Sequence, residues 1–258
     1  MPYLPSDGPS RTTIAFMQAD TAVIIAAKDE QDRIAATVEA AASLPGVDLV
    51  VVVDDGSTDA TGRLAAGSGA RVIRHSRNRG KGAAMETGAA AVRLLDEDVP
   101  HHLLFLDADL GETAKQAGPL IEPVRDGSVS MTIAVFSELV KLGGHGFVVR
   151  LSRDGIKRLT GWSATQPLNG QRCLTRAAFD AAQPLAPGFG VETGLTIDLL
   201  RQGFEITEVE VPLSHRATGT DWRAQLHRAR QFRDVGRALA AREPAVTRQL
   251  DRLRRGAR

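Results

Sequence analysis

The sequence has few of the features that mark secreted, membrane-spanning or nucleic-acid-binding proteins. Its one cysteine, Cys173, cannot form an internal disulfide, and no N-terminal basic-then-apolar segment resembles a signal peptide. No apolar run approaches the roughly 18 residues that span a bilayer. The formal net charge of the 258 residues is only +1, which argues against wholesale nucleic-acid binding. We therefore expect a cytoplasmic protein with no nucleic-acid partner, whose contact with lipid would be peripheral.

What the sequence does contain is an alternation of strands and helices. Apolar runs at 21–27 and 47–53 predict buried strands, and the segment from about 30 to 43 has the spacing of an amphipathic helix. A strand at 103–106 follows an alanine-rich helix at 83–95. With 43% hydrophobic residues, this order predicts an α/β fold with a mostly parallel, Rossmann-like sheet flanked by helices.

The second half is less regular and ends in a basic region. Strands are expected at 131–136 and 205–211, and helices at 147–159 and 190–201. A C-terminal amphipathic helix is indicated by apolar residues at spacings of three or four: Trp222, Leu226, Ala229, Phe232, Val235 and Leu239. From residue 216 onward twelve arginines accompany only four acidic residues, which fits either a solvated helix face or docking to anionic lipid.

Two carboxylates, Asp107 and Asp109, follow the strand at 103–106 with the small residue Ala108 between them. Residues two apart on a strand project to the same side, so the two charges repel unless a cation lies between them. The nearby ligands are hard oxygens, which favour Mg²⁺ or Mn²⁺ over zinc, and such ions usually hold substrate phosphates. The pair predicts a diphosphate-bearing substrate; the structural alternative is a helix cap at Asp109.

Two more polar clusters precede this pair. Asp54 and Asp55 lie in an acidic turn whose glycine permits close approach of a base or ribose, although the turn could equally cap a helix. The loop at 77–82, RNRGKG, places Lys81 and two glycines just before a helix, where an anion is favoured; the alternative is an exposed basic loop. Ligands gather beyond the carboxyl ends of strands in open α/β sheets, so we expect the clusters at 26–30, 54–57 and 107–109 to share one edge.

The segments AAKDEQDRI, VVVDDGSTD, RNRGKGAA and LFLDADL resemble, in this order, the family 2 glycosyltransferases of the GT-A fold. The resemblance covers roughly residues 20–135. It implies a metal-dependent enzyme that moves a sugar from a UDP- or GDP-sugar to an acceptor hydroxyl. The residues that would contact the donor are Ala26, Asp29, Glu30, Asp54, Asp55, Lys81, Asp107 and Ala108. Asp107 and Asp109 would hold Mg²⁺ or Mn²⁺.

Three later segments, QPLNGQR, GFGVETGL and SHR, are similar to motifs of the glucosyl-3-phosphoglycerate and mannosylglycerate synthases. This resemblance makes His215 a third metal ligand and Glu192 a catalytic-site residue that, with Asp109, acts near the reacting carbon. Those enzymes retain the anomeric configuration, whereas Glu192 would serve an inverting enzyme as general base, so the stereochemistry stays open. The stretch at 143–148 lacks the Arg and Thr that grip the acceptor's phosphate in that group, which predicts a different, less charged acceptor pocket.

We expect three parts in the sequence: a segment at 1–19 whose Pro/Gly/Ser-rich start predicts disorder, a catalytic domain at 20–220 and a basic helical tail at 221–258. Within the catalytic domain we expect a nucleotide-binding half at about 20–135 and an acceptor half at about 136–220. The acceptor is either a small molecule or a lipid phosphate. Peripheral membrane contact through the basic helix and a homodimer both stay open.

Two other functions compete with this interpretation. A sugar-phosphate nucleotidyltransferase shares a nucleotide-binding α/β half, but usually has a Gly-rich loop after its first strand, where this sequence reads AAKDE. A non-catalytic sugar-nucleotide-binding protein would keep the donor motifs, but the presence of Glu192 and His215 argues against it.

Overall fold

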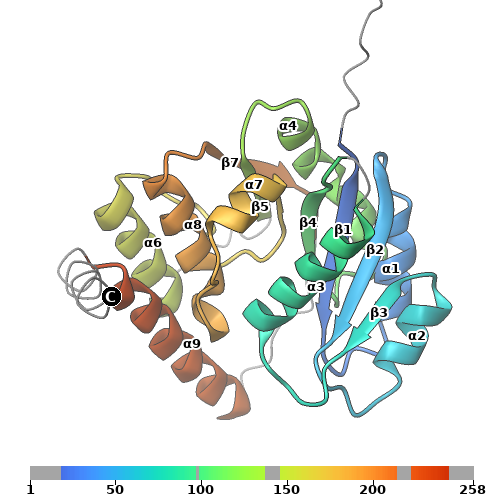
Figure 1. Ribbon diagram of the computed structural model, residues 1–258. Coiled ribbons are helices and arrows are strands. Elements are labelled where there is room, and N and C mark those ends of the chain that lie inside the picture. The colour runs from blue at the N-terminus through green and yellow to red at the C-terminus, as the bar shows by residue number, and fades with distance from the viewer. Residues whose placement is uncertain (1–18, 97–98, 137–145, 214–221, 244–258) are drawn as a thin grey trace, which may run out of the picture.

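The computed structural model describes residues 19–96, 99–136, 146–213 and 222–243, with the backbone alone over 222–228 (Figure 1). Its seven strands form one sheet in the order β3-β2-β1-β4-β6-β5-β7. The strands are β1 (Thr21–Ala27), β2 (Val47–Asp54), β3 (Arg71–Arg74), β4 (His102–Asp107), β5 (Met131–Phe136), β6 (Arg172–Leu174) and β7 (Ile206–Val211). All neighbours are parallel except β6, which runs antiparallel to both β4 and β5. The mostly parallel sheet predicted from the sequence is confirmed.

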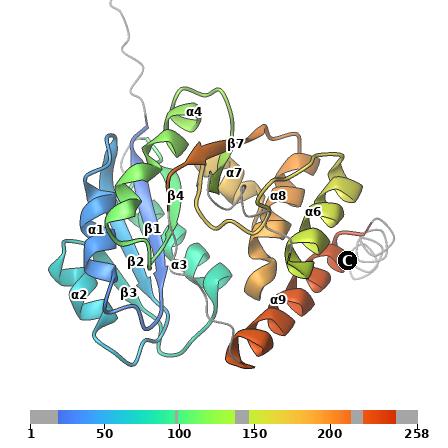
Figure 2. The ribbon, with the colours of Figure 1, turned by 180° about the vertical axis from the view of Figure 1, so that it is seen from behind.

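Helices cover both faces of the sheet (Figures 1 and 2). The α-helices are α1 (Ile34–Ala42), α2 (Thr61–Gly67), α3 (Lys81–Leu95), α4 (Glu122–Arg125), α6 (Phe147–Thr160), α7 (Arg176–Ala181), α8 (Val191–Arg201) and α9 (Trp222–Ala241). Two 3₁₀ helices, η1 (Gly111–Leu120) and η2 (Gly188–Gly190), precede α4 and α8. None of the helices in the described ranges combines the length and apolarity needed to cross a membrane.

The strand alternation of β1 divides the core into two layers. Val23 and Ile25 pack in the apolar cluster shared with α1 and η1, whereas Ala22 and Ile24 pack in the cluster shared with α3, α7 and α8. All four side chains are essentially inaccessible to solvent. The close packing of α3 requires Gly88, because a Cβ there would lie 2.4 Å from Ile24 Cγ2. This packing fixes the N-terminus of α3 against the edge of the sheet.

A third, smaller apolar cluster joins α6, α8 and α9 beside the sheet (Figure 2). It contains Val148 and Ile156 of α6, Ile197 of α8, and Val235 and Leu239 of α9. The helix predicted from the apolar spacing after residue 222 is therefore present. Val235 and Leu239 of the predicted apolar stripe pack against α6 and α8, whereas Ala229 and Phe232 are exposed. The segment 1–18, most of the part expected to be disordered, lies outside the described residues.

Candidate active site

The three polar clusters meet at one edge of the sheet, as the sequence predicts. In the register of β1 with its neighbours, Ala27 pairs with Asp54 of β2 and Ala26 pairs with Asp107 of β4. Because these strands are parallel, the segments that follow them leave the sheet on the same side. The first acidic loop, the DDGS turn and the carboxylate pair are therefore neighbours.

The two aspartates of the DDGS turn have different environments. Asp54 is fully buried, and its Oδ1 accepts a hydrogen bond from the Ser57 N–H at 2.8 Å, so it fixes the turn internally. Asp55 lies beside a pocket and receives the N–H groups of Arg79 and Gly80 at 2.8 Å each. Adjacent strand-end residues point to opposite sides, which accounts for the difference.

Asp55 connects the DDGS turn to the start of α3. Its burial alone would raise the pKa of the carboxyl, but the hydrogen bonds from His75, Arg79 and Gly80 hold that pKa below its ordinary value. His75 Nδ1 lies 2.7 Å from Asp55 Oδ1. Gly80 itself adopts φ +88°, in the left-handed region that favours glycine. The result is a rigid approach to Lys81, the first residue of α3.

The first acidic loop is also tied to the DDGS turn. Asp29 has φ +54°, an uncommon conformation for a residue with a side chain, and its N–H donates to Ser57 Oγ at 3.0 Å. Hydrogen bonds from Lys28 and from the Thr58 N–H lower the pKa of the exposed Asp29 carboxyl to about 2. The Glu30 N–H donates to Thr61 Oγ1 at 2.8 Å. Asp29 and Glu30 thus hold the rim of the site in one conformation.

Lys81 joins the carboxylates of two distant elements. Its ammonium lies 2.7 Å from Asp107 Oδ1 at the end of β4 and 3.1 Å from Glu192 Oε1 in the first turn of α8. Burial alone would lower the pKa of Lys81, but attraction to Asp107 and Glu192 outweighs it and raises that pKa above its ordinary value. The ammonium therefore stays charged at any physiological pH.

The main chain around the carboxylate pair is clamped by α1 and the residue before it. Thr37 Oγ1 donates to the main-chain oxygen of Ala108 at 2.9 Å, and Arg33 Nη1 donates to that of Asp109 at 3.1 Å. Ala108 is buried, whereas Asp107 and Asp109 are half-buried. The clamp holds the segment that carries both carboxylates without using their oxygens.

The candidate metal ligands fit a hard cation. The Asp107 carboxylate already holds a positive group, the Lys81 ammonium, and Asp109 supplies a second carboxylate two residues on. Within the residues that the structure describes, no group of three His, Cys, Asp or Glu residues could hold a metal ion. His215, the predicted third ligand, lies outside the described residues.

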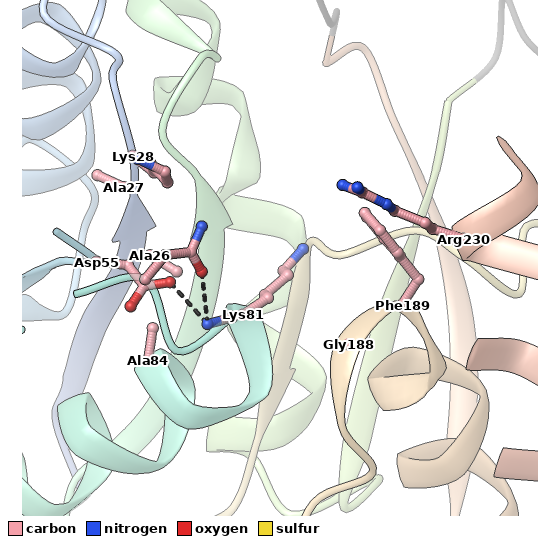
Figure 3. A pocket seen from close by; sticks show the side chains of 11 residues that line it. Ala26, Ala27, Lys28, Asp55, Lys81, Ala84, Gly188, Phe189 and Arg230 are labelled. Carbon is pink, nitrogen blue, oxygen red and sulfur yellow. Dashed lines mark hydrogen bonds between the residues drawn. The ribbon is translucent and has the colours of Figure 1, made fainter. Parts of the chain in front are cut away.

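A pocket of about 350 Å³ opens beside Lys81 (Figure 3). One wall contains Ala26, Lys28, Asp55 and Lys81, and the opposite wall contains Gly188, Phe189 and Arg230. Figure 3 shows Arg230, from α9, and Phe189 across the pocket from the Lys81 side chain. The volume is within the range of small-molecule sites. Arg230 was not among the residues expected at the site, since sequence spacing alone does not indicate where α9 packs.

Two further residues near the site, Gln171 and Arg172, were quoted in a motif but not predicted as site residues. Gln171 is fully buried and hydrogen-bonds to both the side chain and the main chain of Asp107. Arg172 is 1% exposed and donates to main-chain oxygens of two elements. The signal for both is the polar pair that ends the QPLNGQR segment, at the start of the short strand β6.

Several known proteins are similar to this chain. The model of the family "Glycosyl transferase family 2" matches residues 22–172. A glucosyl-3-phosphoglycerate synthase of Mycolicibacterium paratuberculosis is 30% identical over 216 residues, which cover 72% of this chain and 63% of that protein. The glycosyltransferase AglJ of Haloferax volcanii is 28% identical over 179 residues, which cover 67% of this chain and 56% of that protein. The chain therefore spans less than two thirds of the length of these relatives.

Solved structures of a glucosyl-3-phosphoglycerate synthase are also similar to this chain. The glucosyl-3-phosphoglycerate synthase of Mycobacterium tuberculosis, in complex with Mn²⁺, uridine diphosphate and phosphoglyceric acid, has a TM-score of 0.71 and 26% identity to this chain. The match covers 87% of this chain and 78% of that one. A second complex of the same enzyme holds Mg²⁺ and uridine diphosphate, with a TM-score of 0.69 and 25% identity.

Proposed function

Since the chain belongs to glycosyltransferase family 2 and has the GT-A fold, we propose that it transfers a sugar from a nucleoside diphosphate sugar to an acceptor hydroxyl with the help of Mg²⁺ or Mn²⁺. The main support for the proposal is that the Lys81 ammonium forms ion pairs with both Asp107 and Glu192. One cation contacts both Asp107, a member of the carboxylate pair expected to hold the donor, and Glu192, the carboxylate expected near the acceptor. The pocket beside Lys81 supplies space for the ligand.

In this proposal the half at 20–135 holds the donor and the half at 136–220 holds the acceptor. Ala26 and Asp55 line the pocket, Asp29 and Glu30 shape its rim, and Asp54 supports the turn from inside. A nucleoside diphosphate would lie along this wall. The N-terminus of α3 faces the same region, where main-chain N–H groups favour a diphosphate.

The transfer itself would depend on stabilising the leaving diphosphate. Asp107, Asp109 and His215 would hold the metal, which neutralises negative charge as the glycosidic bond breaks. Lys81 adds a second, permanently positive group at the same place. Glu192 would bind the sugar or the acceptor next to the reacting carbon, and in an inverting enzyme it would deprotonate the acceptor. Proton NMR of the anomeric hydrogen in the product distinguishes retention from inversion of the anomeric configuration.

The acceptor class and the location are part of the same proposal. We propose a cytoplasmic enzyme that acts on a small molecule or a lipid phosphate and that can self-associate as a homodimer. Arg230, Arg233 and Arg237 of α9 are exposed and three and four residues apart, so they lie on one side of the helix. Each basic residue near an anionic membrane contributes about 1 kcal/mol of binding energy. Flotation with phosphatidylserine vesicles tests this: equal recovery of the wild type and of a variant with these three arginines changed to Gln would refute the membrane contact.

A thermal-shift panel of UDP- and GDP-sugars with Mn²⁺ tests the donor part of the proposal. A ligand present at about 100 times its Kd stabilises the protein by about 2.7 kcal/mol, so the cognate donor should raise Tm only when the metal is present. Absence of any metal-dependent shift across the panel would refute the function. Release of the nucleoside diphosphate from the donor in the presence of metal, and its loss when the metal is chelated, would indicate an enzyme. A non-catalytic sugar-nucleotide-binding protein would release none. Pyrophosphate formed from a nucleoside triphosphate and a sugar phosphate would instead indicate a nucleotidyltransferase.

A further inference from the structure

Gln171 holds the Asp107 carboxylate in a single orientation. Its Nε2 donates to Asp107 Oδ2 at 2.9 Å, and its Oε1 accepts from the Asp107 main-chain N–H at 3.1 Å. A carboxamide is suited to this task because it provides a donor and an acceptor side by side. With Oδ2 engaged by Gln171, Asp107 presents Oδ1 to the Lys81 ammonium.

The residue before Gln171 shows how closely the chain approaches this ion pair. A Cβ on Gly170 would lie 2.2 Å from Lys81 Nζ and 3.1 Å from Asp107 Oδ1. Any larger side chain would therefore compete for the space that the ammonium occupies. Gln171 can reach both groups of Asp107 because the main chain passes directly beside the pair.

The residue after Gln171 is a buried guanidinium that bridges two elements. Arg172 donates to the main-chain oxygens of Pro167 and Asn169 in the loop before β6, at 3.0 and 2.9 Å. Its Nη1 donates to the main-chain oxygen of Glu192 at 3.0 Å and to Thr196 Oγ1 at 2.8 Å. The same side chain therefore fixes the loop to the first turn of α8.

The charge of Arg172 is costly in this position. It forms no ion pair with a described residue, and its burial lowers the pKa of the guanidinium to about 10, against the opposing attraction of Glu192 and Glu208. A buried charge without an ion pair destabilises a fold unless hydrogen bonds satisfy it. Here the hydrogen bonds satisfy it by joining the segment that orients Asp107 to the helix that carries Glu192.

We propose that Gln171 is a positioning residue for Asp107, and that Arg172 fixes Gln171 and Glu192 relative to each other. Asp107, Lys81 and Glu192 are then held as one unit before any ligand arrives. The inference rests on the proposed function, because it assigns the unit to a metal-dependent donor site. Loss of an outer partner of a metal-binding carboxylate typically weakens metal affinity by about 10- to 100-fold.

The chain offers a matched control in the same loop. Gln166 makes an equivalent pair of hydrogen bonds with Phe136. Its Nε2 donates to the Phe136 main-chain oxygen at 3.0 Å, and its Oε1 accepts from the Phe136 N–H at 3.2 Å. These bonds fix the loop to the end of β5 and do not involve Asp107, Lys81 or Glu192. Gln166 Oε1 also accepts from Asn169 Nδ2 at 3.3 Å, and Asn169 Oδ1 accepts from the Gln171 N–H. Gln166→Leu therefore removes a comparable structural contact and reaches the proposed unit only indirectly, through Asn169.

The test is calorimetric titration of the full chain with UDP and with GDP, each with and without Mn²⁺. We expect Gln171→Leu to weaken the Mn²⁺-dependent binding of the nucleotide about 10- to 100-fold, and Gln166→Leu to change it less than about twofold. Thermal unfolding without ligand should show lower Tm values for both variants. A purely structural role for Gln171 would lower Tm without changing the dependence on Mn²⁺.

The outcomes separate the two proposals. If the wild type binds a nucleotide with Mn²⁺ and both variants weaken that binding equally, the positioning role of Gln171 is refuted while the function stands. If the wild type binds neither nucleotide, the proposed function is refuted. Should Gln171→Leu fail to fold, Gln171→Glu decides, since it keeps the size of the side chain but replaces the donor by a carboxylate facing Asp107. Unchanged Mn²⁺-dependent binding in that folded variant would equally refute the inference.

Discussion

Lys81 and Glu192 lie 3.1 Å apart, which joins the two halves of the site through one ion pair. Lys81 begins α3, which packs on β1, and Glu192 lies in the first turn of α8, which packs on the same face of the sheet. The Glu192 side chain is only 10% exposed. The relative position of donor and acceptor would therefore be set in the fold before either ligand binds.

Replacing Lys81 with Met should reduce turnover about 10²- to 10³-fold, the usual cost of losing one preorganised group that stabilises developing charge. The variant leaves Asp107 and Glu192 side by side without the ammonium that neutralises both. Release of the nucleoside diphosphate from the donor measures the effect. Lys115→Met is the control, because Lys115 is exposed and forms an ion pair with the exposed Glu112 on η1, at 3.5 Å. Equal turnover in the two variants would contradict the role of Lys81.

Replacing Asp109 with Asn should abolish transfer and leave the fold intact. The substitution removes one metal charge from a half-buried position whose main chain is held independently by Arg33. Turnover at saturating Mn²⁺ and the Tm of the unliganded protein measure the two effects. Asp126→Asn, in an exposed turn where the carboxylate accepts from the Ser128 N–H, should leave turnover unchanged. Wild-type turnover in Asp109→Asn would remove this residue from the site.

The sheet and its functional edge could be predicted from the sequence because both follow from local patterns. Continuous apolar runs such as 49–53 mark strands buried on both faces, and parallel strands bring their carboxyl ends together. Individual contacts at that edge were harder to foresee. Asp54 and Asp55 were both expected to contact the donor, but the alternation of the strand turns Asp54 into the core and Asp55 toward the pocket.

The contacts of Gln171 and Arg172 could not be predicted, because they depend on a strand of three residues. β6 enters antiparallel between β4 and β5, and only this insertion places Gln171 beside Asp107. A strand of that length has no detectable periodicity. The pairing of Lys81 with Glu192 likewise depends on how α8 packs against α3, which local sequence does not encode.

Replacing Gly170 with Ala should reduce turnover more than it impairs folding. The added Cβ would lie 2.2 Å from Lys81 Nζ, the end of a flexible side chain that can move away. A shift of about 1 Å in a catalytic group can cost about 10²-fold in rate, whereas the fold only has to accommodate a displaced ammonium. Turnover and Tm should be measured for Gly170→Ala and for Gly67→Ala, where a Cβ meets nothing within 4 Å. A large fall in Tm without loss of turnover would contradict this expectation.

Stability should also depend on pH through His101, at the opposite end of β4 from the site. His101 Nδ1 hydrogen-bonds to Asp96, and its Nε2 lies 3.0 Å from Asp48 Oδ1. Burial alone would lower the pKa of His101, but Asp96 and Asp48 outweigh it and raise that pKa above its ordinary value of 6.5.

Because the folded state binds this proton more tightly than the unfolded state, the stabilisation by His101 is fully present below about pH 6.5, the value in unfolded chains. It is lost as the pH rises through the higher pKa of the folded state. Urea unfolding of the wild type and of His101→Gln should therefore show the larger difference in unfolding free energy at acidic pH and a smaller one at alkaline pH. A difference that does not change with pH would show that the His101 cluster stabilises the fold by packing and not by charge, and one that grows as the pH rises would contradict the raised pKa.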